Sequence, residues 1–202
     1  LGQPGSGKTT TLLKLAQSLI NKAELDQSQA IPVVLNLSSW GQKPKQTIVT
    51  WLVQELKRTY QCSDSLGKLW IKNEALILLL DGLDEVEEKY RNDCVKELNI
   101  FLQEYGVTEL VVCCRVLDYK NLSERLMLRS AICVQLLTLK QINHYLNQAE
   151  EQLSALKEVI QCNVELQEFA SSPLILNIMS LTYQGCSLEQ LGHLDTPRLF
   201  DA

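Results

Sequence analysis

The sequence predicts an α/β fold in which a parallel β-sheet is flanked by helices and followed by a small helical subdomain. Short apolar runs alternate with segments whose apolar residues recur at helical spacing, a pattern typical of a parallel sheet. A glycine-rich loop precedes the first helical segment, and one apolar run ends in a cluster of acidic residues. The alternation stops after Leu136. We therefore expect an α/β domain at residues 1–136 and a helical subdomain at residues 137–202.

Strands are expected where the apolar runs stand, at residues 31–37, 75–80, 109–114 and 131–136. The run at 75–80 is apolar at every position, which predicts a strand that is buried on both faces. Helices are expected at residues 10–20, 47–60, 86–104 and 138–158, and from Pro173 onward. A proline suits the first turn of a helix, because the N–H that it lacks has no partner there in any case.

The composition is that of a globular protein able to form a sizeable core, since 46% of the 202 residues are hydrophobic and 21% are charged. A formal net charge of −5 argues against binding to nucleic acid or to an anionic membrane surface. No apolar run approaches the roughly 18 residues that would span a bilayer. The seven cysteines are scattered without a C-x-x-C pair, which favours reduced thiols in a cytoplasmic protein.

Residues 2–9 read Gly-Gln-Pro-Gly-Ser-Gly-Lys-Thr and fit the pattern G-x-x-x-x-G-K-[ST] of a phosphate-binding loop. Glycines let backbone N–H groups surround an anion, and the following helix adds the positive end of its dipole. Lys8 would reach the β- and γ-phosphates, and the Thr9 hydroxyl would ligate Mg²⁺. The candidate nucleotide-binding residues are Gly2, Gly5, Ser6, Gly7, Lys8, Thr9 and Thr10. Such a loop ordinarily follows a buried strand, so a first strand is expected upstream of Leu1. The alternative is a glycine-rich turn that precedes a helix by chance.

The strand expected at residues 75–80 is followed by Asp81-Gly82-Leu83-Asp84-Glu85. An acid in this position lies at the carboxyl end of a parallel strand, beside the phosphate loop in this fold class. We expect Asp81 to hold Mg²⁺ together with Thr9. Glu85 would orient the attacking water, with Asp84 as its rival or helper. The alternative is a solvated acidic turn, which the presence of the loop makes less favourable.

Three further residues stand at the ends of predicted elements. Arg115 closes the strand at 109–114, where its guanidinium would face the γ-phosphate and act as a third catalytic candidate. Its alternative is a surface ion pair, with Asp118 as the partner. Trp40 either supports the site or covers the sheet edge, and the second reading is favoured. Pro173 either touches the adenine or only starts a helix.

Together these motifs resemble the NACHT family of signal-transduction ATPases with numerous domains (STAND), a branch of the AAA+-related P-loop NTPases. Residues 2–9 resemble the first nucleotide motif of the family. Residues 76–85, with their Asp-Gly-x-Asp-Glu ending, resemble its second motif. The sensor-arginine strand, the start of the helical domain and its proline motif are matched by residues 111–115, 134–139 and 171–174. Residues 113–119 are similar to bacterial members.

The resemblance implies a switch in a multidomain signalling or defence protein. Such proteins hold ADP in a closed state, exchange it for ATP and then self-associate to drive an effector, while slow hydrolysis resets them. Adenine nucleotide and Mg²⁺ are the implied ligands, and a winged-helix region would follow Ala202. Two alternatives remain, a nucleotide-binding scaffold that does not hydrolyse and a P-loop small-molecule kinase. A kinase would need an acceptor pocket and an arginine-bearing lid, for which the sequence offers no convincing candidate.

Overall fold

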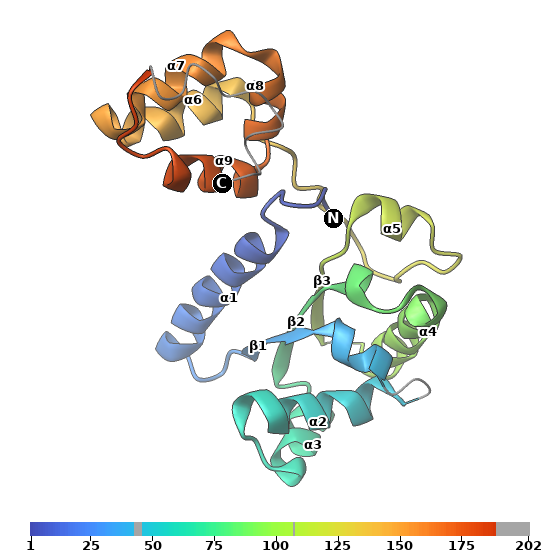
Figure 1. Cartoon of the computed structure of the whole chain (residues 1–202). Helices are drawn as coiled ribbons and strands as arrows, with labels where there is room; N and C mark the ends of the chain where they lie inside the picture. Colours follow the sequence, from blue (N-terminus) through green and yellow to red (C-terminus); the bar gives the residue numbers. More distant parts are fainter. Residues whose placement is uncertain (43–45, 107, 189–202) are drawn as a thin grey trace. The chain divides into compact units, whose positions relative to one another are not determined.

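In the computed structural model, the described residues are 1–42, 46–106 and 108–188, and the chain divides into two compact units (Figure 1). The first unit consists of Leu1–Gly2 and Lys8–Cys133 and is an α/β structure. The second consists of Gln3–Gly7 and the chain from Val134 onward, and its described elements are helical. Each unit is described by itself. The assignment of nucleotide binding to residues 1–136 and of a separate subdomain to 137–202 stays a prediction.

The first unit is built on one parallel sheet of three strands in the order β1-β2-β3. Its elements in chain order are α1 (Lys8–Leu25), β1 (Ile31–Asn36), the 3₁₀ helix η1 (Leu37–Gln42), α2 (Ile48–Tyr60), α3 (Asp64–Lys72), β2 (Leu76–Asp81), the 3₁₀ helix η2 (Leu83–Glu85), α4 (Glu88–Glu104), β3 (Glu109–Val112) and α5 (Val116–Lys120). The register pairs Asn36 with Asp81 and Leu80 with Val112, so the carboxyl ends of the strands meet at one edge. The predicted α/β fold with a parallel sheet is confirmed.

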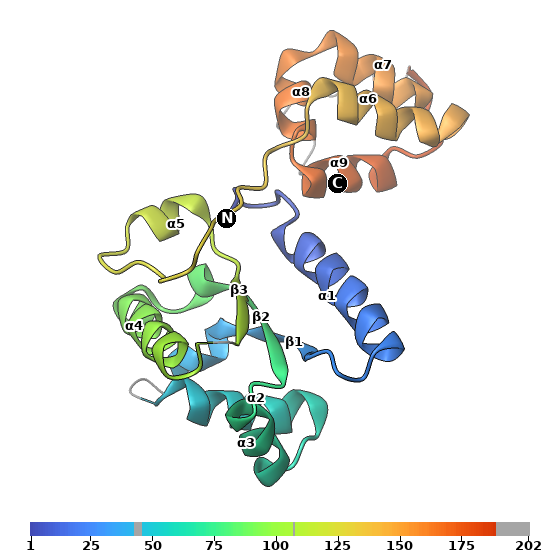
Figure 2. The same cartoon turned by 180° about the vertical axis from the view of Figure 1, so that it is seen from behind.

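Strand β2 is buried on both faces, as its apolar run predicts. Successive side chains of a strand point to opposite faces of a sheet. Ile77 and Leu79 accordingly pack against α1, on Leu12 and Ala16. The alternate residues of β2 face the larger core, to which α2, α3 and α4 contribute. Figures 1 and 2 show α1 on one side of the sheet and these three helices on the other.

Helix α2 illustrates how local sequence sets an element of this core. The Thr47 hydroxyl accepts a hydrogen bond from the Thr50 N–H at 3.2 Å, which satisfies one of the free N–H groups of the first turn. The apolar residues at helical spacing predict an inward face, and Trp51 and Leu52 on this face are buried. Trp40 of η1 is fully buried in the same core and therefore has a packing role.

Two expectations about the second half of the chain are wrong. Residues 131–136 form no strand among the described residues: only an isolated bridge at Val134 is present, and most of the six residues are exposed. The Leu1 amino group donates a hydrogen bond to the Ile132 carbonyl at 2.7 Å, but one such bond is not the repeated pairing of a strand. The long helix expected at 138–158 is instead broken into α6 (Leu139–Gln148), a 3₁₀ turn at Glu150–Leu153 and α7 (Ser154–Cys162). Helices α3 and α5 were not expected, and the helix predicted from residue 86 begins at Glu88.

The break between α6 and α7 lets the second unit form its own core. A straight helix could bury only one stripe, whereas two shorter helices can pack their apolar faces on each other. Helices α8 (Val164–Ala170) and α9 (Pro173–Thr182) also belong to the described part of this unit (Figure 2). Its core includes Ile142, Leu156, Leu166 and Met179. Pro173 stands in the first turn of α9, as predicted.

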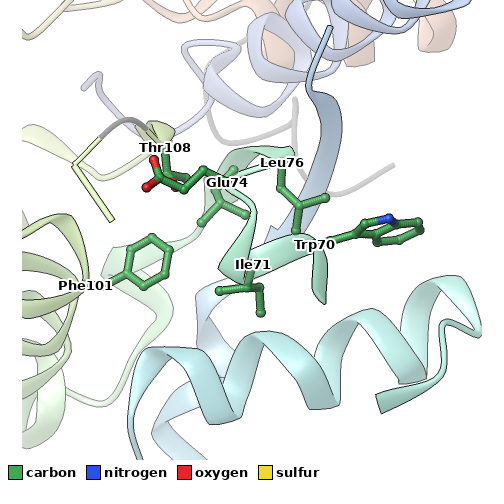
Figure 3. Close-up of a pocket in the computed structure, with 7 residues that line it drawn as sticks. Trp70, Ile71, Glu74, Leu76, Phe101 and Thr108 are labelled. Atoms are coloured by element: carbon green, nitrogen blue, oxygen red, sulfur yellow. The ribbon is translucent and has the colours of Figure 1, made fainter. Parts of the chain in front are cut away.

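A narrow apolar gap lies at the amino end of β2, between α3 and α4 (Figure 3). Trp70, Leu76 and Phe101 are among the residues that line it. Leu76 opens the strand whose other end is Asp81, so the gap lies away from the strand ends that carry the predicted site. A ligand pocket needs far more room than this gap offers, and the gap plays no part in the site described next.

Candidate functional site

The loop at residues 2–7 has the backbone that its glycines predict. Gly5 and Gly7 have φ angles of 68° and 87°, in the left-handed region where a side chain is strained. Helix α1 begins directly after them at Lys8 and runs for 18 residues, so the N–H groups of its first turn lie next to the loop. The Lys8 ammonium donates to the Gly2 carbonyl at 3.3 Å, which holds its charge at the loop.

Two observations indicate that this loop suits an anion. A Cβ added to Gly7 would meet no heavy atom within 4 Å, so the space beside the turn is open. The Ser6 hydroxyl is buried and has no hydrogen-bond partner among the described residues. A buried hydroxyl without a partner needs an explanation, and a phosphate oxygen would supply the missing acceptor. Thr10 is exposed on the first turn of α1. The loop residues therefore fit a polyphosphate.

Thr9 and Asp81 are brought together from positions 72 residues apart. The Thr9 hydroxyl donates to Asp81 Oδ2 at 2.6 Å, while the Gly82 N–H donates to the other carboxylate oxygen at 3.0 Å. A hydroxyl and a carboxylate are hard oxygen ligands of the kind that Mg²⁺ takes. No cluster of three or more His, Cys, Asp or Glu side chains suited to a metal occurs among the described residues. A magnesium ion that keeps several waters and binds phosphate oxygens needs no such cluster, so this pair fits Mg²⁺.

Glu85 lies in the turn that follows Asp81, with its side chain exposed. Gly82 enters this turn with a φ of 76°, and a Cβ there would lie 2.8 Å from the Glu85 carboxylate. The Asn36 side-chain amide donates to Glu85 Oε2 at 2.9 Å. The orientation of the Asn36 amide is fixed in turn, because its oxygen accepts from the Ser38 N–H at 2.7 Å. Glu85 is thus held by a hydrogen bond from the end of the neighbouring strand.

Asp84 makes different contacts from Glu85. Its side chain is only 8% exposed, and its Oδ2 lies 2.8 Å from the Nε of Arg115. Its other oxygen accepts the backbone N–H of Arg115 at 3.0 Å. Arg115 is therefore in an ion pair, but not with Asp118 as the alternative reading supposed, because the Asp118 carboxylate is bound by Arg91 at 2.8 Å. β3 neighbours β2, and Arg115 lies beside the acidic turn; that its guanidinium faces a γ-phosphate stays a prediction.

Asn36 and Arg91 were not among the residues predicted for the site. Asn36 is the polar end of an apolar strand, the same signal that identified Asp81, and the sequence could have indicated it. Arg91 shows no such signal. Its guanidinium reaches the carbonyls of Asp84 and Val86 as well as Asp118, and these contacts become visible only when α4 is folded against the turn.

A thiol lies against the carboxylate that is proposed to bind the metal. Burial raises the pKa of Cys113 to about 11, and the negative charge of Asp81 adds to the effect. Cys113 follows β3, and its N–H donates to the Leu80 carbonyl at 2.8 Å. At neutral pH the Cys113 thiol is protonated, so it adds no charge beside Asp81.

The residues next to Pro173 contact the middle of the loop. The Ser172 hydroxyl and the Leu174 N–H both donate to the Gly5 carbonyl, each at 3.3 Å, and this part of the loop is grouped with the helical unit. Gly5 has no room for a larger residue, because an added Cβ would lie 2.6 Å from Ser172 Oγ. Pro173 itself starts α9. Contact between Pro173 and an adenine stays a prediction.

A parallel α/β sheet, an anion-binding loop that opens a helix, and a hydroxyl–carboxylate pair at the carboxyl end of a strand define a P-loop NTPase. The family model for the NACHT domain matches residues 1–152, and the chain belongs to this family. It is accordingly a nucleotide-binding NTPase module, and the resemblance seen in the motifs is confirmed. No curated protein matches the chain at a significant level. Each helix in the described residues is too short or too polar to cross a membrane.

Proposed function

We propose that the chain is an ATP-binding, slowly hydrolysing NTPase module that acts as a nucleotide-dependent switch in a multidomain signalling or defence protein. The observation that carries the proposal is the hydrogen bond of 2.6 Å between Thr9 and Asp81. It joins the end of the phosphate loop to the acidic end of the buried strand, which is the arrangement needed to bind a nucleotide with its magnesium ion. The choice of adenine rests on the family resemblance.

Each part of the site has a separate task in this proposal. The loop N–H groups, the Ser6 hydroxyl and Lys8 bind the phosphates, while Thr9 and Asp81 hold Mg²⁺. When bound, Mg²⁺ neutralises charge on the β- and γ-phosphate oxygens. Glu85 orients the attacking water and accepts its proton, because it is exposed and held by a neutral amide donor rather than by a cation. Asp84 binds Arg115 instead, since one of its carboxylate oxygens contacts the guanidinium and the other accepts from the backbone N–H of Arg115.

Arg115 gives the module a means of responding to the γ-phosphate. Its side chain is half exposed, and Asp84 provides a resting partner for the guanidinium. A γ-phosphate would compete with Asp84 for that guanidinium, whereas ADP offers no such competitor. The ATP and ADP states would then differ in the contacts of Arg115, which is the differential interaction that a switch requires. Self-association of the intact protein on activation is part of this proposal.

The cellular location follows from the cysteines. The seven cysteines form no disulfides among the described residues, and the first four of them are buried: Cys62, Cys94, Cys113, Cys114, Cys133, Cys162 and Cys186. Free thiols persist in a reducing compartment, so we place the protein in the cytoplasm. The net charge of −5 supports the absence of direct nucleic-acid or membrane binding by this segment.

Binding of nucleotide to the Lys8→Ala variant tests the proposal. We expect isothermal titration to show that Mg-ATP and Mg-ADP bind the parent chain. Neither nucleotide should bind the Lys8→Ala variant measurably, because the ammonium that neutralises phosphate charge is missing. The control is Lys14→Ala, which removes an exposed lysine from the same helix. Slow release of inorganic phosphate from ATP by the parent supports the switch. Binding without any release would favour the non-hydrolysing scaffold, and equal affinities of the two variants would contradict the site.

A further inference from the structure

Arg91, near the start of α4, is the most extensively bonded cation next to the acidic turn. Its side chain is 13% exposed. The Nε donates to the Val86 carbonyl at 3.1 Å, one terminal nitrogen donates to the Asp84 carbonyl at 2.8 Å, and the other lies 2.8 Å from Asp118 Oδ1. Each nitrogen of the guanidinium therefore has its own acceptor.

Two of these acceptors are the carbonyls on either side of Glu85. A planar guanidinium that binds both carbonyls fixes the peptide group directly before Glu85 and the one directly after Val86, and so restrains the short stretch of backbone that sets the direction of the Glu85 side chain. The other contacts of the turn act on its side chains or on its first residue: Arg115 binds the Asp84 carboxylate, Asn36 binds Glu85, and the Leu83 N–H donates to the Cys113 carbonyl at 3.1 Å, while the turn itself has few internal bonds. It is a 3₁₀ helix of three residues whose own bonds run from Glu85 N–H to Gly82 at 2.9 Å and from Val86 N–H to Leu83 at 3.4 Å.

The third acceptor connects the turn with the segment that carries Arg115. Asp118 lies in α5, which begins at the residue directly after Arg115. The same two segments are joined a second time by the pair of Arg115 with Asp84. If Arg115 leaves Asp84 for a γ-phosphate, the Arg91–Asp118 pair still holds α5 against the turn.

We propose that Arg91 is a positioning residue for hydrolysis: it fixes the backbone on both sides of Glu85 and keeps Glu85 in register with Arg115. This inference rests on the proposed function, because it assigns Glu85 to the attacking water. A purely structural role would be served as well by an apolar side chain, since burying a guanidinium costs free energy unless every donor finds a partner. Here the partners are the two carbonyls that determine where Glu85 points.

The test compares Arg91→Met with Lys89→Met in the full chain. Arg91→Met keeps a long side chain and removes all three contacts, whereas Lys89→Met removes an exposed ammonium that pairs with Glu87 at 2.9 Å on the same stretch of chain. Two quantities are measured, the steady-state kinetics of Mg-ATP hydrolysis and the hydrogen–deuterium exchange of the backbone amides of residues 82–86. For Arg91→Met we expect kcat to fall by about tenfold or more. KM should change little, because Arg91 acts on Glu85 and not on the bound substrate.

Amide exchange at residues 82–86 should be faster in Arg91→Met than in the parent, and unchanged in Lys89→Met. Arg91→Lys is the conservative variant, and it carries the test if Arg91→Met does not fold. One ammonium cannot serve three acceptors on two segments, so kcat and exchange should recover only in part. The inference would be overturned if Arg91→Lys had the kcat and the amide exchange of the parent. It would also be overturned if amide exchange at residues 82–86 in both Arg91 variants were as slow as in Lys89→Met. A parent that binds ATP without hydrolysing it would contradict the proposed function, and the exchange data would still decide the role of Arg91.

Discussion

Arg115 and Asp84 are joined by two contacts at once, one from the guanidinium at 2.8 Å and one from the backbone N–H at 3.0 Å. The arginine side chain is 50% exposed while the aspartate side chain is 8% exposed. The carboxylate is thus fixed within the protein, whereas the guanidinium has a face open to solvent. A second anion could approach the guanidinium from that side, which is why we assign the response to the γ-phosphate to this pair.

Arg115→Ala should therefore weaken ATP binding more than ADP binding. A hydrogen bond to a charged group contributes about 1.5–3 kcal/mol, so the ratio of ATP to ADP affinity should fall by roughly tenfold or more. Isothermal titration with ATP and with ADP measures the two affinities and hence their ratio. Lys57→Ala, which breaks an exposed ion pair with Asp64 on a different part of the unit, is the control. Equal losses for the two nucleotides would mean that Arg115 serves only to stabilise Asp84.

Glu85→Gln should retain ATP binding and lower the hydrolysis rate at least about tenfold, which corresponds to about 1.4 kcal/mol of barrier. Glutamine keeps an oxygen that can still accept from Asn36, so the substitution removes the base and its charge without removing the contact. Phosphate release under single-turnover conditions is the measurement. Glu88→Gln, an exposed position three residues further along, is the matched control. Hydrolysis at the parent rate in Glu85→Gln would transfer the role to Asp84.

The elements that could be predicted from the sequence are those set by local pattern. The apolar run of β2 and the spacing of α2 follow from the periodicity of buried side chains, and the loop and the acidic turn follow from their glycines and carboxylates. Residues 131–136 have the composition of a strand, yet a strand also needs a partner along its length. The pattern of apolar residues carries no information about which partner is present, and this explains the wrong prediction.

The residues of the site also fall into those that the sequence indicates and those that it does not. Residues at the end of an apolar strand, such as Asp81 and Arg115, can be found because parallel strands place their carboxyl ends together. The sequence suggested Asp118 as the alternative partner of Arg115, and only the folded structure shows that the partner is Asp84. Arg91 forms an ion pair with Asp118, and Arg115 forms one with Asp84. The backbone carbonyls that Arg91 binds have no sequence signature at all.

Gly82→Ala should destabilise the fold and slow hydrolysis together. With a φ of 76°, Gly82 is in the left-handed region, where a side chain costs about 1–2 kcal/mol. The added Cβ would also lie 2.8 Å from Glu85 Oε2 and 3.1 Å from Asn36 Oδ1, so it would separate these two residues. Urea unfolding and single-turnover hydrolysis measure the two effects.

Gly67→Ala provides the opposite case within the same unit. Gly67 lies in α3, and an added Cβ would approach no heavy atom closer than 3.5 Å, which is ordinary contact. Alanine in a helix is favoured over glycine by about 0.8–1.0 kcal/mol, so this variant should be at least as stable as the parent and hydrolyse at the same rate. A Gly82→Ala variant that matched it in both measurements would show that the turn at Gly82 tolerates a side chain.

The buried thiols predict a loss of stability at alkaline pH. Burial raises the pKa of Cys94 and of Cys114 to about 12 and that of Cys113 to about 11, from an ordinary value near 9. Above pH 9 the unfolded chain gives up these protons while the folded chain keeps them, so the free energy of unfolding falls as pH rises. Between about pH 8 and about pH 10 one such thiol should account for about 1.4 kcal/mol of the fall.

Urea unfolding of Cys94→Ala at both pH values isolates one of these contributions. The substitution lowers stability at each pH by removing buried volume, but the difference between the two pH values should shrink, because a thiol that titrates only in the unfolded chain has been removed. Cys162→Ala is the control, since it makes the same substitution at an exposed position. The same pH dependence in Cys94→Ala and in the parent would contradict a raised pKa. It would mean that the folded protein admits enough water to Cys94 for the thiolate to form there as easily as in the unfolded chain.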